Sequence, residues 1–588
     1  MMQTAAHWRS LFCICAVAVC GAALSACSDH PPEIVSISPS IGDLGQPLVI
    51  TGRGFGDERN ESYITIAGAS PTSAAYISWS DAEIVVRVSE FGTPGLVRVH
   101  RGRSSSNPVL FSNQSVLPQR LLGDDDADSG VVPRIISITP ASAAVGALVT
   151  ITGNNFGLSR ENSAALFSWN SESAAGAQPS GVVEVSALEF GYEFWSDREI
   201  RVRVPSGAVS GNVTVQTLRG ASPPVFFEIA EQQGTKLFRD RRSFVLSYSV
   251  DVQAEQASIP NALYLWMPKP AVSSSQRNVK IVERTVEPFV ENHRGTSLFH
   301  FSNLASGANI RVTVSYVVDV YAVETNIANQ NPVNVNSPSP IRAAYTAPSP
   351  LVPSNHADIL PFAVQITGTE RRPYAMARRI YNWMLESLDF QSLNFQFLDF
   401  QTADIQPLDL QSLDLQSLDL QSLNTELQSA DIRAETLSGG ALEALQERTA
   451  DSYRAALLFC ALARASGIPA IPVSGVLINS RLATVRHYWA EFWLDGFGWV
   501  PVDPALGAGA APEFFPLRED YAAFYFGNMD NQRVAFSRGE HALAQMTPGG
   551  RTVQRPRELS LQNLWEEASG ALQSHSSLWS DVIITGTF

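Results

Sequence analysis

The chain has 588 residues, of which 45% are hydrophobic and 17% are charged, and its formal net charge is −16. One hydrophobic core stops growing near about 300 residues, so this length predicts several globular domains. The composition excludes a disordered chain. The acidic surplus argues against a nucleic-acid partner, because no excess of cations exists to replace phosphate counterions.

Residues 1–26 have the pattern of an export signal. Arg9 precedes an apolar stretch, Leu11 to Leu24, that is short for a membrane span and ends in small residues. The run Leu24-Ser25-Ala26-Cys27 resembles a bacterial lipobox, which implies cleavage before Cys27 and a lipid on its sulfur. An ordinary signal peptide that carries a cysteine is the alternative. With the lipid, we expect a bacterial cell-envelope protein, periplasmic or surface-exposed, held at a membrane by its acyl chains.

An internal repeat follows the signal. Residues 33–56 (EIVSISPSIGDLGQPLVITGRGFG) match residues 134–157 (RIISITPASAAVGALVTITGNNFG), and residues 79–88 match 195–204. Both copies alternate apolar and polar residues and are rich in Val and Ile, which is typical of half-buried strands. The blocks resemble the TIG (IPT) family of immunoglobulin-like domains.

That resemblance implies two all-β sandwiches, over residues 32–113 and 132–230, acting as spacers or as binding units. Trp79 and Trp195 fit core or edge packing better than a ligand platform. The aspartate-rich residues 114–131 indicate a solvated linker. They lack the spacing of a calcium loop, and we expect no metal.

A third β-rich segment covers residues 235–325. The runs 244–250 and 310–316 are typical strands. The segment resembles the β-domain that often precedes a transglutaminase-like core, so we expect a β-sandwich here. Residues 326–367, rich in Asn, Pro, Ser and Ala, indicate a linker.

A five-residue repeat occupies residues 388–424, with units such as Leu418-Asp419-Leu420-Gln421-Ser422. This period fits neither a helix nor an alternating strand. It superficially resembles the pentapeptide-repeat β-helix, but it has few coils and mostly Leu at the inward position. We interpret it as an insertion, either a short β-helical coil or a disordered loop.

Two motifs follow the insertion. Residues 449–475 read TADSYRAALLFCALARASGIPAIPVSG, which predicts an amphipathic helix from Ser452 to Ser466, ended by Gly467. Residues 487–504 read HYWAEFWLDGFGWVPVDP, which predicts two strands joined by a turn.

These motifs resemble the transglutaminase-like, papain-type hydrolases over residues 368–540. The runs that carry the resemblance are ARASGIPA (463–470), HYWAEFW (487–493) and GWVPVDP (498–504). The resemblance implies an α+β core, with a nucleophile at the start of the helix. It also implies that His487 is the base and that Asp503 orients the imidazole.

The family's nucleophilic cysteine falls on position 452, which is Ser here. The family's preceding glycine and its later arginine are also replaced, by residues 449–451 and by Ile471. A serine hydroxyl is far less acidic than a thiol, so it needs concerted proton removal and an oxyanion hole. Cys460 lies about 12 Å further along the same helix, among core residues.

Three hypotheses therefore stay open. The first is a catalytically impaired domain whose cleft binds a peptide, a cell-wall peptide or a protein partner, with the TIG pair as a stalk. The second is an active amidase, protease or acyltransferase with a Ser452, His487 and Asp503 triad. The third is a structural, adhesin-like protein. None of the three needs a cofactor, and residues 541–588 carry no assignment.

Overall fold

The structure describes most of the chain from residue 31 onward, with several gaps. The computed structural model covers residues 31–38, 41–42, 47–66, 68–88, 95–102, 104–113, 132–160, 162–171, 179–230, 234–327, 339–391, 440–555 and 557–588. The signal segment with Cys27, the linker 114–131 and repeat residues 392–424 lie outside these ranges. The chain divides into two compact units, of which the first contains the first repeat and the second contains nearly all the rest.

The first repeat is a pair of packed sheets. One has the order β1-β3-β6-β5 and the other β2-β9-β7-β4, with β8 beside β7. Buried Ile and Val side chains from both sheets form the core between them. The bounds are β1 Glu33–Ser38, β2 Ile41–Gly42, β3 Pro47–Arg53, β4 Tyr63–Ile66, β5 Tyr76–Trp79, β6 Glu83–Arg87, β7 Gly95–Arg101, β8 Ser104–Ser105 and β9 Val109–Asn113, with a short 3-10 turn at Ser73–Ala75.

The second repeat has the same architecture. Its sheets have the orders β10-β12-β16-β15 and β11-β19-β17-β13-β14, with β18 beside β17. Equivalent tryptophans, Trp79 and Trp195, donate from Nε1 to the carbonyls of Phe55 and Phe156, each at 3.2 Å. The bounds are β10 Arg134–Thr139, β11 Ser142–Ala143, β12 Leu148–Asn154, β13 Ala164–Trp169, β14 Gly181–Glu184, β15 Tyr192–Trp195, β16 Glu199–Arg203, β17 Gly211–Thr217, β18 Gly220–Ala221 and β19 Val225–Ile229.

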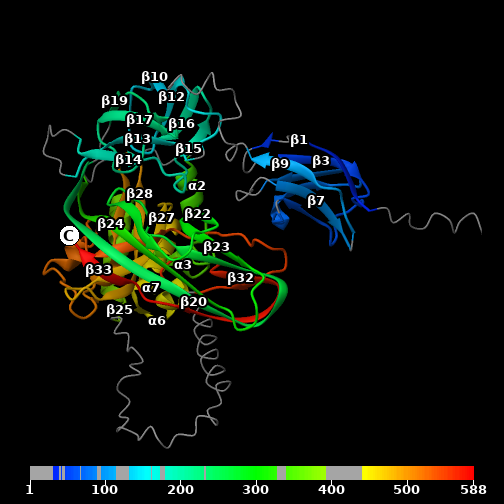
Figure 1. Cartoon of the computed structure of the whole chain (residues 1–588). Helices are drawn as coiled ribbons and strands as arrows, with labels where there is room; N and C mark the ends of the chain where they lie inside the picture. The colour runs from blue at the N-terminus through cyan, green and yellow to red at the C-terminus, as the bar shows by residue number, and fades with distance from the viewer. Residues whose placement is uncertain are drawn as a thin grey trace, which may run out of the picture. The chain divides into compact units, whose positions relative to one another are not determined.

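The third β-rich segment belongs to one large sheet that the C-terminal residues complete. Strands β21, β24, β20, β23 and β22 lie in that order, and β32 and β33 also pair with β20. Figure 1 shows β32 and β33, in red, beside β20, in green. The bounds are β20 Gly234–Pro268, β21 Gln276–Arg284, β22 Val290–His293, β23 Thr296–Ser302, β24 Asn309–Ile327, β31 Arg551–Val553, β32 Glu566–Trp579 and β33 Ile583–Thr587.

This arrangement differs from the self-contained sandwich expected over residues 235–325. The sheet takes strands from residues 541–588, and its hydrophobic core includes Val476, Ile478, Val534 and Phe536, which belong to strands of the following domain. Its apolar face is therefore covered by the following domain.

The transglutaminase-like core places helices against a sheet of order β29-β28-β27-β30. Helix α7 is buried along most of its length, and its side chains pack with those of β28 and β29. The bounds are α2 Pro340–Thr346, α3 Ile359–Thr367, α4 Pro373–Ser387, β25 Asp389–Phe390, α6 Gly440–Glu447, β26 Thr449–Ala450, α7 Ser452–Ala465, β27 Ala470–Ile478, β28 Thr484–Leu494, β29 Gly498–Val502, α8 Pro504–Gly507, α9 Tyr521–Phe524 and β30 Arg533–Arg538.

The linker expected over residues 326–367 is wrong for its described part, 339–367. Proline at the first position starts α2, as helices often begin, and α3 follows it. Ile359 and Ala363 of α3 are buried against α7. Arg464 of α7 donates to the carbonyl of Ala347 at 3.0 Å. The composition of residues 339–367 gave no sign of these contacts, because it is rich in Pro, Ser and Ala.

The second repeat packs directly against the sheet formed by β27 to β30. Gly496, in the turn between β28 and β29, donates from its N–H to the carbonyl of Val145 at 3.1 Å. A Cβ on Gly146 would lie 2.7 Å from the Trp493 ring, so this close approach requires glycine. Trp493 and Trp499 share one hydrophobic cluster with the core of the repeat. The repeat is thus built onto the strands that carry the site.

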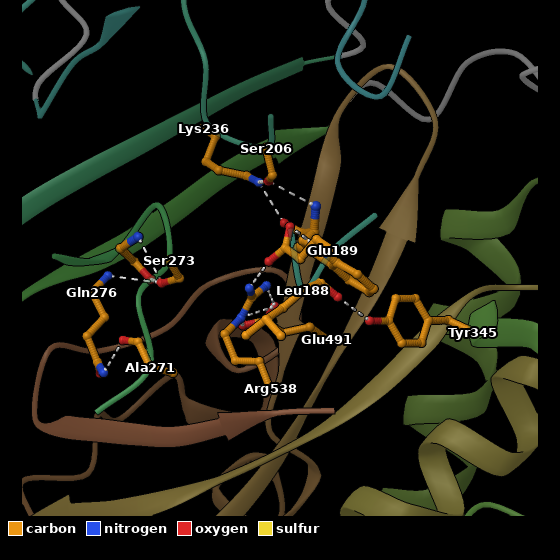
Figure 2. A network of polar contacts seen from close by, with 12 residues as sticks. Leu188, Glu189, Ser206, Lys236, Ala271, Ser273, Gln276, Tyr345, Glu491 and Arg538 are labelled. Carbon is orange, nitrogen blue, oxygen red and sulfur yellow. Dashed lines mark hydrogen bonds and ion pairs between the residues drawn. The ribbon is translucent and has the colours of Figure 1, made fainter. Parts of the chain in front are cut away.

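Polar contacts reinforce this junction (Figure 2). Arg538 of β30 points toward Glu189 of the repeat and Glu491 of β28, and it forms ion pairs with both. Lys236 donates to the Trp499 carbonyl at 2.6 Å and to Ser206 Oγ at 3.2 Å. Within the described ranges, no helix is both long and apolar enough to cross a membrane.

Candidate active site

Ser452 is the first residue of α7. Asp451 caps the helix, because its Oδ1 accepts from the Arg454 N–H at 2.8 Å. Asp451 is itself held by Arg557, whose Nη1 donates to Oδ2 at 2.9 Å. Ser452 is 3% exposed, and its Oγ makes no hydrogen bond to any described residue. The hydroxyl is thus buried and unpartnered at the positive end of the helix dipole.

His487 and Asp503 are brought together by two neighbouring strands. His487 lies on β28, and Asp503 directly follows β29, which pairs with β28 in antiparallel register. His487 Nε2 lies 2.8 Å from Asp503 Oδ2. A carboxylate only accepts hydrogen bonds, so Nε2 carries the proton and Nδ1 is left as an acceptor.

The backbone also fixes the carboxylate of Asp503. The Asp503-Pro504 sequence starts α8, and Asp503 Oδ1 accepts from the Leu506 N–H at 3.1 Å. The Trp489 ring stacks on the His487 ring, with centroids 6.3 Å apart and planes 24° apart. The pair is therefore held in one orientation before any ligand binds.

Arg533 completes this arrangement, and the sequence motifs gave no sign of it. Its Nη1 donates to Asp503 Oδ2 at 2.9 Å, and its Nη2 donates to Asp530 Oδ2 at 2.5 Å. The side chain is 4% exposed. Arg533 begins β30 and lies 30 residues beyond Asp503, so only the pairing of β30 with β27 brings it to the site.

These contacts set the charge of the Asp503 carboxyl. Burial by itself would raise its pKa, but the His487 imidazole, the Arg533 guanidinium and the Leu506 amide together lower the pKa to about 2. Asp503 is therefore a carboxylate throughout the physiological range, and it can hold the imidazole in one tautomer.

A small hollow contains both Ser452 and His487. Its volume is about 10 Å³, roughly the space of a single water molecule. Its walls are Gln391, Ser452, Val485, Arg486, His487, Ala505, Ala510 and Pro512. Asp503 is absent from these walls and lies behind the imidazole. The structure thus places Ser452 and His487 at one hollow, and it pairs His487 with the Asp503 carboxylate, which does not line that hollow.

Gln391 is a second residue that sequence reasoning missed. It belongs to the first unit of the five-residue repeat, which was assigned to an insertion. Leu388 of that unit is buried in the helical core, and the Gln391 N–H donates to the Ala450 carbonyl at 3.0 Å. Residues 388–391 are therefore attached to the domain, through buried Leu388 and the pairing of β25 with β26, and Gln391 lines the hollow.

Cys460 does not take part in the site. It is fully buried, and burial raises the pKa of its thiol to about 12. A thiol in that state is unreactive. No group of three or more His, Cys, Asp or Glu side chains among the described residues is placed to hold a metal ion.

Comparison with known families agrees with this architecture. Residues 32–113 and 133–229 match the IPT/TIG domain, and residues 421–504 match the core of the transglutaminase-like superfamily. The chain therefore contains two IPT/TIG domains followed by a transglutaminase-like domain, in a mostly β, multidomain fold.

Similarity to individual proteins is local. Over 127 residues the chain is 28% identical to the cyclomaltodextrin glucanotransferase of Paenibacillus macerans, a match that covers 22% of this chain and 16% of that enzyme. The chain thus spans less than a fifth of the length of that curated relative.

Solved structures that match the chain are only distantly similar to it. A candidate cysteine protease from Cytophaga hutchinsonii is 14% identical, with a TM-score of 0.35, over 60% of this chain and 92% of that one. A surface glycan-binding protein from Prevotella bryantii is 7% identical, with a TM-score of 0.14, over 51% of this chain and 98% of that one. At these TM-scores, neither structure carries an argument about activity.

Proposed function

We propose that this chain is an envelope-anchored amidase, protease or acyltransferase of the transglutaminase-like class, and that Ser452 is its nucleophile. The observation that carries this proposal is the fully formed His487–Asp503 pair beside the same hollow as the Ser452 hydroxyl. A base oriented by a buried carboxylate is what a serine nucleophile requires. The lipobox-like run ending at Cys27 supports the envelope location.

In the first half of the reaction, Ser452 Oγ attacks the carbonyl carbon of the acyl donor. Its proton passes to His487 Nδ1, and Asp503 stabilises the imidazolium that results. Collapse of the tetrahedral intermediate transfers that proton to the leaving amine and leaves an ester on Ser452. Water or an acceptor amine then attacks the ester, with His487 again as the base.

The start of α7 supplies candidates for the oxyanion hole. The first N–H groups of a helix have no intrahelical acceptor, and those of Ser452 and Tyr453 precede the capped N–H of Arg454. Gln391 also lines the hollow, and its side-chain amide is of a type that can donate. Both donor sets would stabilise negative charge that develops next to Oγ.

The substrate class follows from this chemistry. A nucleophile of this kind acts on acyl groups, and we propose peptide amides as donors, including cell-wall peptides or a partner protein. We propose no nucleic-acid substrate, because of the acidic surplus of the chain.

One observation favours a second candidate, a binding domain with impaired catalysis. Ser452 Oγ makes no hydrogen bond to His487, and the hollow between them has only about 10 Å³. In that case the same surface would bind a peptide without cleaving it. Hydrogen bonds at catalytic sites often tighten only when substrate is bound, which is why we place this candidate second.

A serine-directed fluorophosphonate probe separates the two candidates. The active site predicts one covalent adduct, located at Ser452 by peptide mapping. The adduct should be lost in Ser452→Ala and strongly reduced in His487→Gln. A folded wild-type protein that forms no adduct would refute the enzymatic proposal and leave the binding domain.

A further inference from the structure

A wide cleft lies where the second IPT/TIG domain meets the large sheet built on β20. Its volume is about 880 Å³, and ligand pockets range from about 300 to 1,000 Å³. Residues 182–184 of β14 line one wall, and residues 277–281 of β21 line the other. Both strands belong to the same compact unit of the chain. The cleft shares no lining residue with the hollow beside Ser452.

Both walls are edges of sheets rather than faces of sheets. β14 ends the strand order of its sheet, and β21 ends the order of the large sheet, so no described strand pairs with the outer edge of either. Side chains alternate across a strand, whereas the lining residues 182–184 and 277–281 are consecutive. Backbone groups of the two edges therefore face the cleft.

The pairing of β14 identifies the backbone groups on its free edge. The Val185 N–H donates to a carbonyl of β13 at 3.0 Å, so in this antiparallel ladder the alternate residues Val182 and Glu184 face away from β13. In agreement, the Val182 carbonyl accepts a hydrogen bond from Arg277 of β21, across the cleft. β21 pairs with β24 through two shifts of register, whereas β14 pairs with β13 without any. The regular edge of β14 is the better template for a further strand.

The lining of the cleft is more cationic than the chain as a whole, whose net charge is −16. Lys269 pairs with Glu291 at 3.1 Å, and Arg538 forms an ion pair with Glu189 (Figure 2). These pairs neutralise most of the carboxylates in the lining. The cationic side chains are Arg160, Lys269, Arg277, Lys280 and Arg538, and the carboxylates are Glu184, Glu189 and Glu291.

Arg277 and Lys280, both on β21, are the cations most available to a ligand. No described carboxylate forms an ion pair with either of them. The Arg277 guanidinium lies over the Trp169 ring, with Cζ 4.0 Å from the centroid, and Lys280 is exposed. A guanidinium that is already held in place binds a carboxylate at a low cost in side-chain entropy.

The cleft also presents apolar side chains to a ligand. Val182, Leu188 and Val272 are 42%, 52% and 62% exposed. A small inorganic anion would leave these side chains and the free strand edge without partners. An extended polypeptide with acidic and apolar side chains supplies all three kinds of partner, since its backbone can also pair with a strand edge.

We propose that this cleft binds an extended, acidic polypeptide segment of another protein, which adds as a strand to the free edge of β14 and directs its carboxylates toward Arg277 and Lys280. The site lies apart from Ser452 and does not depend on the proposed catalytic function. It makes the second IPT/TIG domain a binding unit as well as a support for the domain that follows.

The test is fluorescence anisotropy of a short labelled peptide, in which valine and glutamate alternate, titrated with the full chain. We expect saturable binding that weakens as salt is added, although the chain as a whole is acidic and would repel the peptide. Two matched peptides serve as controls. One has glutamine in place of glutamate, and the other is methylated on its backbone nitrogens and cannot donate hydrogen bonds. Each should bind about tenfold more weakly, because it lacks one of the two interactions.

Substitutions in the protein locate the site. Lys280→Glu should weaken binding about tenfold, because an attraction becomes a repulsion. Val182→Pro should also weaken binding, because it removes an N–H from the free edge and leaves the pairing with β13 intact. Arg219→Glu, which reverses an exposed cation of the same domain outside the cleft, should leave the affinity unchanged. Ser452→Ala should also leave it unchanged.

The proposal is overturned if the alternating peptide does not bind, or if the methylated peptide binds as tightly as its parent. It is also overturned if Lys280→Glu and Arg219→Glu change the affinity equally. Tighter binding of oligogalacturonate, which has carboxylates but no peptide N–H groups, would show that the cleft takes an acidic polysaccharide instead. Loss of fluorophosphonate labelling at Ser452 with peptide binding intact would refute the catalytic function alone.

Discussion

Glu189, in the second IPT/TIG domain, forms an ion pair with Arg538 of β30, although 349 positions separate the two residues. Arg538 also holds Glu491, which lies on the same strand as His487. Trp499 donates from Nε1 to Glu189 at 3.1 Å. The second IPT/TIG domain is therefore joined to the sheet of β27 to β30 by partly buried charges, and it is not a detached stalk.

We expect Arg538→Met to destabilise the protein by about 3 kcal/mol, because two carboxylates then lose their cation in a largely buried place. The control is Arg311→Met, which removes an exposed partner of Asp251 and should cost far less, because water screens that pair. Urea unfolding followed by tryptophan fluorescence measures both. If the two substitutions lowered the free energy of unfolding equally, the ion pairs of Arg538 would stabilise the fold no more than an exposed ion pair does.

The low pKa of Asp503 predicts how stability changes in acid. The folded pKa of about 2 lies below the ordinary unfolded value near 3.9, so the unfolded chain binds the proton first. The contribution, roughly 2 kcal/mol, is complete above pH 4 and is lost as the pH falls toward 2.

In Asp503→Asn, this part of the pH dependence should disappear, although the variant is less stable at every pH. The exposed Asp520, paired with Arg518, provides the control substitution Asp520→Asn. The free energy of unfolding measured between pH 2 and 5 tests the prediction. If the free energy of unfolding of Asp503→Asn still changed with pH as steeply as in the wild type, other carboxyl groups would be responsible for the pH dependence.

Lys236 predicts a second rise of stability with pH, in alkali. Burial lowers the pKa of its ammonium to about 8, below the ordinary value of 10.5. Between these two pH values the unfolded chain holds the extra proton, so stability should rise as the pH increases from 8 to 10.5. Lys236→Met should remove this rise. Lys269→Met, which removes a lysine that pairs with Glu291, should retain it. Unfolding titrations in this pH range provide the measurement.

Ser452→Cys should create a reactive thiol at the site. The start of α7 and the nearby imidazole both favour a thiolate there. Cys460 should stay unlabelled by iodoacetamide, because it is fully buried and the pKa of its thiol is about 12. Peptide mapping identifies the alkylated residue, and adding His487→Ala should slow the reaction at least tenfold. Unchanged rates after that second substitution would mean that the imidazole does not reach residue 452.

Local patterns predicted the repeats and the main elements of the site. The helix predicted from Ser452 to Ser466 is α7, which ends at Ala465. The HYWAEFW and GWVPVDP runs lie in β28 and β29 as predicted strands. These segments could be predicted because apolar periodicity, helix caps and turn residues are all local. His487 and Asp503 then meet because consecutive strands pair.

Contacts between distant segments escaped prediction. Arg533 carries no motif, and its partner Asp503 depends on the order of strands in the sheet. The helices within 339–367 were hidden by a composition rich in Pro, Ser and Ala, while Ile359 is buried by the packing of α3 against other helices. Residues 388–391 resemble the repeat that follows them, yet Leu388 is buried in the helical core and β25 pairs with β26. In each case tertiary packing overrides the local signal.

The pairing of β20 with β32 and β33 has a consequence for biogenesis. Residues 244–265 of β20 find these partners only in residues 566–587, which the ribosome makes some 300 residues later. Until then, one side of the longest strand presents unpaired amide and carbonyl groups, which are prone to join other chains. We therefore expect nascent or truncated forms of this protein to need a chaperone that full-length molecules do not.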